Sequence, residues 1–175
     1  MALPQHRLPD EEPLPLKERV ADLIPALRAF ARSFTLDPSD GDDLVQETLM
    51  RALRSLDSFH PGTSLKSWLF TIMRNTYYTQ YRKRMREGPG AKACVSAQPA
   101  MPANQEWSAA EREVQAALGR LGEDQRQILV LVAALGFSYE EAAGVMGCAI
   151  GTVKSRLSRA REALTRELGG NPLTP

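Results

Sequence analysis

The residues of this chain best suited to chemistry lie near its C-terminal end. Behind a turn glycine comes a run of cationic and hydroxyl side chains, which includes Thr152, Lys154, Ser155, Arg156 and Arg159. Such side chains donate hydrogen bonds to base edges and phosphate oxygens, and a helix that carries them fits the major groove of DNA. The chemistry that they favour is the reading of duplex DNA.

The elements that must position these residues form a helix-turn-helix pattern. Ser138 and Glu141 are spaced as a capping box, which predicts a helix start, and Gly147 supplies the turn after that helix. A second helix begins near residue 150 with an apolar stripe of Ile150, Val153, Leu157, Ala160 and Leu164. The alternative is an ordinary helical hairpin with a solvated basic face, which explains fewer of these features.

A second cationic segment, 75–86, mixes tyrosines, amides and cations. Aromatic rings with interleaved cations suit unstacked bases and the phosphate backbone. Taken alone, the segment is better explained as a charged helix end whose tyrosines pack on a core. A second DNA-reading element on the same chain adds weight to nucleic-acid contact.

An acidic segment precedes it. Asp43, Gln46 and Glu47 stand at i, i+3 and i+4, on one exposed strip that suits either a basic partner helix or simply a helix N-terminus. Residues 1–60 hold seven Lys/Arg against eleven Asp/Glu, whereas residues 61–87 hold six against one. This asymmetry predicts DNA contact in two places and a protein partner elsewhere.

Other functions find little support. Cys94 and Cys148 lie far apart with only His6 and His60 available, so neither a zinc site nor a disulfide framework is expected. No nucleophile set, paired-acid site or phosphate-binding glycine loop occurs, which argues against an enzyme. No apolar run approaches the roughly eighteen residues of a membrane span, and no signal peptide is evident, so we expect a cytoplasmic protein.

The periodicity predicts an all-α fold of two small helical domains. The expected divisions are a disordered tail (1–16), a first domain (17–87), a flexible linker (88–107), a second domain (108–168) and a second disordered tail (169–175). The first domain should hold helices at 17–33, kinked at Pro25, at 42–56 and at 65–86, with a turn at 37–41 and a loop at 57–64. The second should include a helix at 123–135 that ends at Gly136.

Three motifs in this order resemble the small two-domain, extracytoplasmic-function sigma factors of bacterial RNA polymerase. They are DDLVQETLMRAL (42–53), SLKSWLFTIMRN (64–75) with YRKR (81–84), and the run from Leu121 to Leu164. The resemblance implies a monomer without cofactor, metal or catalysis, which binds core polymerase and promoter DNA.

The resemblance also implies roles for residues. Asp43, Gln46 and Glu47 would dock on the coiled coil of the largest polymerase subunit. The −10 element would be bound by Phe59, His60, Thr63, Ser64, Trp68, Asn75, Tyr78, Arg82, Lys83 and Arg84. The −35 element would be read by Thr152, Lys154, Ser155, Arg156 and Arg159.

The stretches GFSYEEAA and GCAIGTVKSR further resemble the general-stress-response branch of alphaproteobacteria, which implies a soluble anti-sigma partner. Two alternatives remain. One is a stand-alone helix-turn-helix regulator that binds an operator as a dimer. The other is a sigma-like protein that binds an anti-sigma factor without initiating transcription.

Overall fold

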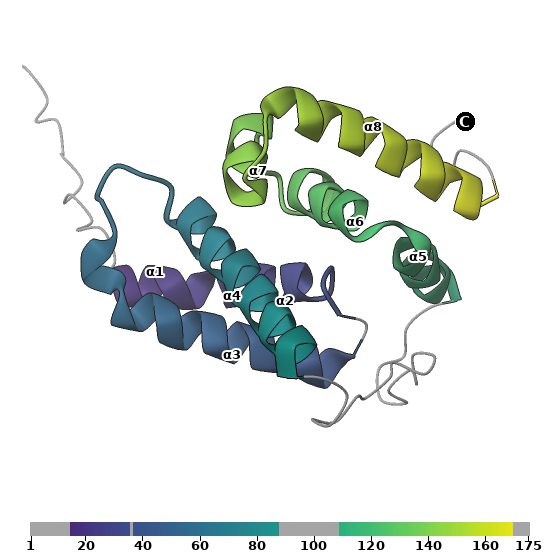
Figure 1. Ribbon diagram of the computed structural model, residues 1–175. Helices are drawn as coiled ribbons and strands as arrows, with labels where there is room; N and C mark the ends of the chain where they lie inside the picture. The colour runs from purple at the N-terminus through teal and green to yellow at the C-terminus, as the bar shows by residue number, and fades with distance from the viewer. Residues whose placement is uncertain (1–14, 36, 88–108, 170–175) are drawn as a thin grey trace, which may run out of the picture.

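The computed structural model describes residues 15–35, 37–87 and 109–169, and every regular element in these ranges is helical. The first bundle holds α1 (Leu16–Asp22), α2 (Ile24–Ala31), α3 (Pro38–Arg54), the 3-10 turn η1 (Leu56–Ser58) and α4 (Leu65–Glu87). The second holds α5 (Ala109–Arg120), α6 (Glu123–Leu129), the π-helical turn η2 (Val130–Ala134), α7 (Tyr139–Met146) and α8 (Ile150–Glu167). Figure 1 shows the two bundles side by side, which confirms the predicted all-α, two-domain architecture. The predicted linker and nearly all of both predicted tails lie outside the described residues.

Pro25 divides the first predicted helix into two. A single kinked helix over 17–33 was expected, but α1 ends at Asp22 and α2 begins at Ile24, with Pro25 in its first turn. Proline has no backbone N–H and its ring crowds the preceding turn, so it is tolerated at a helix start and not within a helix.

The predicted turn at 37–41 is wrong, because α3 already begins at Pro38. The Asp37 side chain caps this helix by accepting a hydrogen bond from the Ser39 N–H at 2.8 Å. Gly41 is buried inside the helix, where a Cβ atom would lie 3.9 Å from the Cβ of Ala31. Turn-forming residues therefore serve here as a helix cap and as a close contact between α2 and α3.

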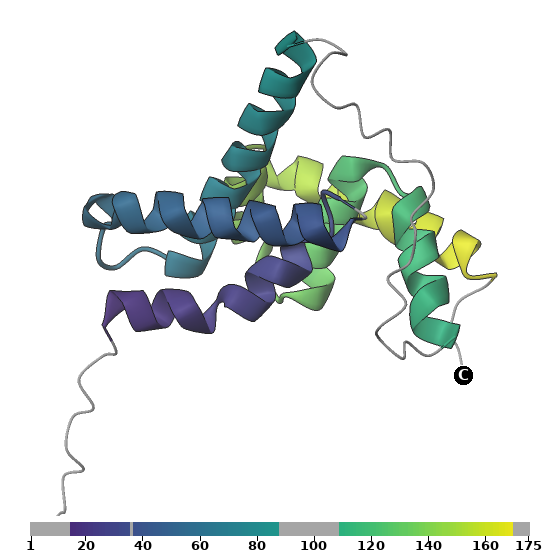
Figure 2. The same ribbon diagram turned by 90° about the horizontal axis from the view of Figure 1, so that it is seen from below.

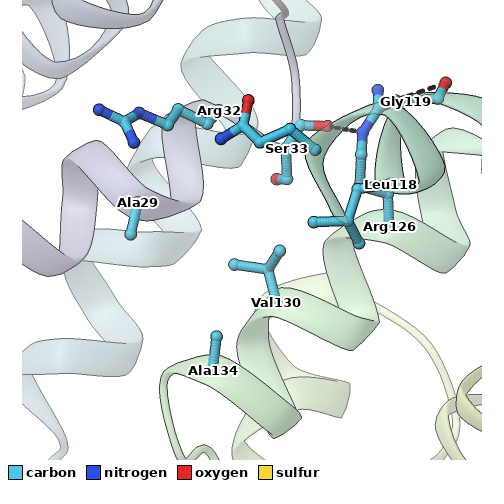
Figure 3. Close-up of a pocket in the computed structure, with 9 residues that line it drawn as sticks. Ala29, Arg32, Ser33, Leu118, Gly119, Arg126, Val130 and Ala134 are labelled. Carbon is cyan, nitrogen blue, oxygen red and sulfur yellow. Dashed lines mark hydrogen bonds between the residues drawn. The ribbon is translucent and has the colours of Figure 1, made fainter. Parts of the chain in front are cut away.

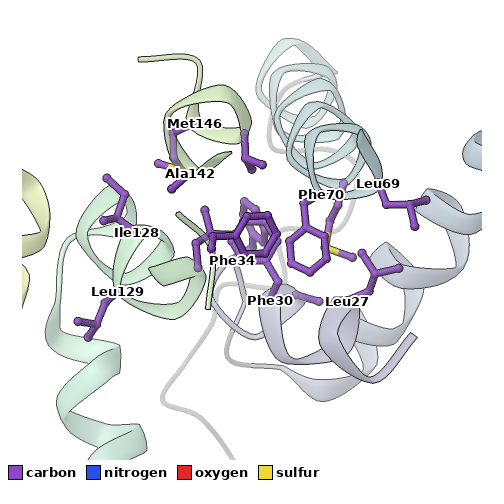
Figure 4. Packing of buried hydrophobic residues seen from close by; sticks show 14 of the residues in the cluster. Leu27, Phe30, Phe34, Leu69, Phe70, Ile128, Leu129, Ala142 and Met146 are labelled. Carbon is purple, nitrogen blue, oxygen red and sulfur yellow. The ribbon is translucent and has the colours of Figure 1, made fainter. Parts of the chain in front are cut away.

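Aromatic rings connect the cores of the two bundles. Phe30 and Phe34 meet edge to face, Phe30 stacks on Phe70 with centroids 5.1 Å apart, and Phe70 contacts Phe137 of the second bundle at 4.9 Å. All four side chains are buried. Figure 4 shows Phe30, Phe34 and Phe70 between the helices of the first bundle and those that carry Ile128 and Met146. The hydrophobic core is therefore continuous across the domain boundary.

The turn between α7 and α8 has the predicted geometry. Ser138 and Glu141 form both hydrogen bonds of a capping box, and Gly147 ends α7 with a left-handed φ of 62°. The predicted helix at 123–135 is present, but its last turn is the π-helical η2, after which Gly136 reverses the chain with φ 68°. Because Phe137 follows directly, this reversal aims its ring at Phe70.

Replacement of Gly147 by alanine should lower the free energy of unfolding by about 1–2 kcal/mol, because a Cβ atom disfavours the left-handed backbone. Gly144→Ala is the matched control. Gly144 lies on the exposed side of α7 with no atom near its Cβ position, so this change should raise stability by about 0.5–1 kcal/mol. Urea unfolding followed by circular dichroism measures both, and equal effects would contradict the assigned turn.

Candidate nucleic-acid interface

Helix α8 places one apolar face inward and one polar face outward. Val153, Leu157 and Ala160 are buried against α6 and α7, as the stripe predicted. Ile150 was also expected inside, but its side chain is 40% exposed because it starts the helix beyond the edge of the core. The predicted −35 residues lie on the outer side: Lys154, Ser155 and Arg159 are exposed, and Thr152 and Arg156 are half-buried.

Two of these residues have local partners. Arg156 Nη1 lies 2.9 Å from Asp124 Oδ2 of α6, and Lys154 Nζ lies 5.8 Å from the centre of the Tyr139 ring. The ion pair is partly exposed, so it orients the guanidinium more than it stabilises the fold. Sequence reasoning missed Asp124, because an acid in the first turn of a helix is already explained by the helix dipole.

Helix α4 carries the second cationic segment. Leu69, Phe70 and Met73 are buried, whereas Asn75 is exposed and Trp68 is half-buried. The last turns of α4 extend beyond the rest of the first bundle in Figure 2, and Arg82, Lys83 and Arg84 are all exposed there. This basic end of α4 is therefore accessible to a polyanion.

The predicted loop at 57–64 begins with η1 and is anchored by Phe59. That side chain is only 8% exposed, and its ring centre lies 5.5 Å from the ring of Trp68. His60, Thr63 and Ser64 are exposed, and Thr63 Oγ1 donates to the His60 carbonyl at 2.7 Å. Phe59 thus supports the loop from inside, and the three polar residues form its outer surface.

A hollow of about 400 Å³ lies beside this loop, bordered by Thr63–Lys66 and by α1. Its α1 side is lined by Arg19 and Asp22, two residues that sequence reasoning did not select. Neither has a distinctive spacing, since they are brought to the loop only by the folding of the bundle.

The acidic strip on α3 is accompanied by exposed apolar residues. Asp43 and Gln46 are exposed, and half-buried Glu47 accepts a hydrogen bond from Arg51 Nε at 2.7 Å. One turn further, Met50 is 46% exposed and Leu53 is 49% exposed. Leu53 therefore lies outside the buried face of this helix, to which Val45 and Ala52 belong.

Tyr78 lies between the two bundles and not on a free surface. Its hydroxyl donates to Glu123 Oε1 of α6 at 2.9 Å. Burial is the main cause that raises the pKa of Tyr78, and burial likewise raises the pKa of its neighbour Tyr77 to about 12. Both phenols therefore remain neutral donors at physiological pH.

Within the described residues, no helix is both long and apolar enough to cross a membrane. Nor does this part of the chain bring together three or more His, Cys, Asp or Glu side chains that could hold a metal ion.

Comparison with known families accounts for both bundles. Residues 20–87 match Sigma-70 region 2, and residues 111–164 match Sigma-70 region 4. These are the two domains of a small sigma factor, the class of subunit that binds core RNA polymerase and directs it to promoters. This class is not a family of catalytic enzymes.

Similarity to individual proteins shows to which group of sigma factors the chain belongs. The ECF RNA polymerase sigma factor EcfG of Rhodopseudomonas palustris is 50% identical over 155 residues, which cover 86% of this chain and 83% of that protein. The sigma factor CnrH of Cupriavidus metallidurans is 36% identical over 80% of this chain and 79% of its own length. This chain therefore belongs to the ECF group of RNA polymerase sigma factors.

Solved structures with a similar fold agree with this assignment. The sigma factor RpoE of Bartonella quintana, in complex with the anti-sigma factor NepR, has a TM-score of 0.77 and 46% identity, over 87% of this chain and 95% of that one. The PhyRSL–NepR complex of Sphingomonas sp. Fr1 has a TM-score of 0.66 at 23% identity, over 93% of this chain and 94% of that one, which is a likeness of fold alone.

Proposed function

We propose that this sigma factor divides its work among three separate surfaces. The acidic strip of α3, with Asp43, Gln46 and Glu47, docks on core polymerase. The loop at 57–64 and the basic face of α4 hold the −10 element, and the outer face of α8 reads the −35 element. The corresponding domains are 17–87 and 108–168. The observation that carries this proposal is that three different sets of side chains are exposed: acids on α3, cations at the end of α4, and hydroxyl and cationic donors on α8.

The α3 surface has the composition of a protein interface. Exposed Met50 and Leu53 beside the acids provide apolar contact area, and the acids provide charge complementarity to a basic helix. The basic end of α4 and the exposed donors of α8 suit phosphates and base edges instead.

We further infer a cytoplasmic role in a stress response, under control of a soluble anti-sigma factor. The similarity to RpoE of Bartonella quintana, which was solved with NepR, supports such a partner. On this view the chain itself catalyses no reaction, since bond formation belongs to the polymerase that it directs.

Run-off transcription tests the function. Purified chain is added to sigma-free core polymerase on a fragmented genomic library, and the transcript starts are mapped. Specific starts at a fixed distance below a shared −35/−10 pair are expected. If a folded chain directs no specific transcripts, the proposal fails, and a sigma-like protein that only titrates an anti-sigma factor becomes the better explanation.

Glu47→Lys should weaken binding to core polymerase about tenfold to a hundredfold, or roughly 1.4–2.8 kcal/mol, because it places a cation on the docking strip beside Arg51. The helix should survive, since like charges at i, i+4 cost only about 0.2–0.5 kcal/mol. Affinity is measured by titration of labelled core. Glu113→Lys, an equal charge change at an exposed site of α5, is the control. Unchanged affinity of Glu47→Lys would remove α3 from the interface.

A further inference from the structure

The contact between the two bundles is built from several direct interactions. Besides the Phe70–Phe137 ring contact, Lys66 Nζ donates to the Leu135 carbonyl. Arg126 Nε of α6 donates to the Ser33 carbonyl at 2.7 Å, as Figure 3 shows beside a cavity of about 190 Å³. These interactions hold the second bundle against α4 and the end of α2, and α7 packs along α4 beside them.

A small polar cluster occupies this contact. Glu123 Oε1 accepts hydrogen bonds from the Tyr78 hydroxyl and from Gln127 Nε2, each at 2.9 Å. The Arg74 guanidinium lies 4.7 Å from the centre of the Tyr78 ring. Arg74 Nε and Gln127 Oε1 are buried, and among the described residues neither has a hydrogen-bond partner. Buried polar atoms without a partner are destabilising, so the hydrogen bonding of this cluster is incomplete in the closed form.

The same face of α4 carries nucleic-acid chemistry. Arg74, Tyr78 and Arg82 stand at i, i+4 and i+8, so they form one stripe along the helix, next to Asn75. An aromatic ring between two guanidinium groups suits a stacked base and its phosphate. Glu123 presents to this stripe a carboxylate, which accepts hydrogen bonds from the same donors that would bind a phosphate oxygen.

The residue after Glu123 has a comparable contact. Asp124 pairs with Arg156 of α8, a predicted −35 residue. Two successive acids at the start of α6 therefore each hold a residue of a different predicted DNA surface. The Tyr78 contact crosses between the bundles, whereas the Arg156 contact lies within the second bundle.

We propose that Glu123 closes the free chain by occupying the Arg74–Tyr78 face of α4, and that a single DNA strand competes with it for this face. Glu123 is thus a positioning residue that makes closure of the two domains and capture of the −10 strand mutually exclusive. The proposal also assigns Arg74 to the surface that binds nucleic acid. The proposal rests on the proposed function, in which the basic face of α4, the helix that carries Tyr78, holds the −10 element.

Closure is tested on the full free chain by small-angle X-ray scattering of Glu123→Ala and Asp124→Ala. Both variants remove one acid from the first turn of α6, so each loses a similar interaction with the helix dipole. Only Glu123→Ala releases Tyr78. A hydrogen bond to a carboxylate is strong enough to shift a two-state equilibrium about tenfold or more. We expect Glu123→Ala to elongate the chain and Asp124→Ala to leave its dimensions unchanged.

Competition is tested with a fluorescein-labelled single-stranded 20-mer of mixed sequence. If about nine-tenths of the wild-type molecules are closed, loss of the closed form should tighten the apparent affinity for the 20-mer about tenfold. Arg74→Ala in the Glu123→Ala background should reverse most of this gain. Circular dichroism checks that each variant is folded. Glu123→Gln, which keeps the side-chain length and one weaker acceptor, should give intermediate values for both measurements.

Equal scattering of Glu123→Ala and wild type would overturn the proposal, and so would an elongated variant with unchanged affinity for the 20-mer. These outcomes are independent of core polymerase. Failure of the wild-type chain to direct specific transcripts would instead contradict the proposed function.

Discussion

Reversal of two charges on α8, Lys154→Glu with Arg156→Glu, should reduce transcription from promoters that contain a −35 element by about thirtyfold or more. A good side-chain contact to a base edge contributes about 1–3 kcal/mol, and loss of two such contacts gives at least this factor. Run-off transcription on one promoter with an intact or a scrambled −35 sequence measures the effect. On the scrambled template the variant and the wild type should differ far less.

The control is a second double reversal on the same helix. Arg161 and Arg166 are exposed on α8 but lie outside the predicted −35 set, so Arg161→Glu with Arg166→Glu changes the net charge equally. A further single variant, Asp124→Asn, separates the ion pair from the guanidinium itself, because it releases Arg156 from Asp124 but leaves the guanidinium in place. If both double variants lose activity equally, α8 contributes only nonspecific attraction to DNA, and the assignment of Lys154 and Arg156 fails.

Phe59→Ala should abolish most opening of the −10 element while leaving binding through the −35 element intact. Truncation of a buried phenylalanine costs about 3–5 kcal/mol when the surroundings cannot close the cavity. Here the cavity would lie between the loop and Trp68, so the exposed residues of the loop would lose their fixed positions. Permanganate reactivity of unpaired thymines on a promoter measures opening directly.

Phe59→Leu distinguishes support of the loop from direct contact with a base. Leucine fills most of the same space against Trp68 but has no aromatic ring to stack on DNA. If Phe59 acts by supporting the loop, Phe59→Leu should retain most of the opening. If leucine fails as completely as alanine although thermal melting shows an intact bundle, the ring itself contacts DNA.

Local signals in the sequence predicted local structure well. The capping box of Ser138 and Glu141 and the turn at Gly147 were predicted correctly, because both depend on residues within one helical turn. The start of α3 was not, because Asp37 and Pro38 occur both in turns and at helix starts. The choice between the two depended on burial of Gly41 against α2, which is a contact between elements.

The same distinction applies to the candidate site: features set by local spacing were predicted, and contacts between distant elements were not. Spacing alone placed Lys154, Ser155 and Arg159 on the outer face of α8, where they are exposed. It did not find Glu123, whose contact with Tyr78 spans 45 residues and two domains. A first-turn glutamate is common in helices, so only the packing of one bundle on the other gives this residue its distinct position.

The contact between Phe70 and Phe137 affects how stable the free protein is against aggregation and proteolysis. Both side chains are almost fully shielded from water, so any separation of the bundles exposes two adjacent aromatic faces. Burial of such a ring contributes up to about 2–3 kcal/mol, which the separated chain recovers only on another surface. An idle molecule that stayed open would therefore be prone to aggregation and proteolysis. Contact between the bundles therefore shields both rings from water while the chain is free.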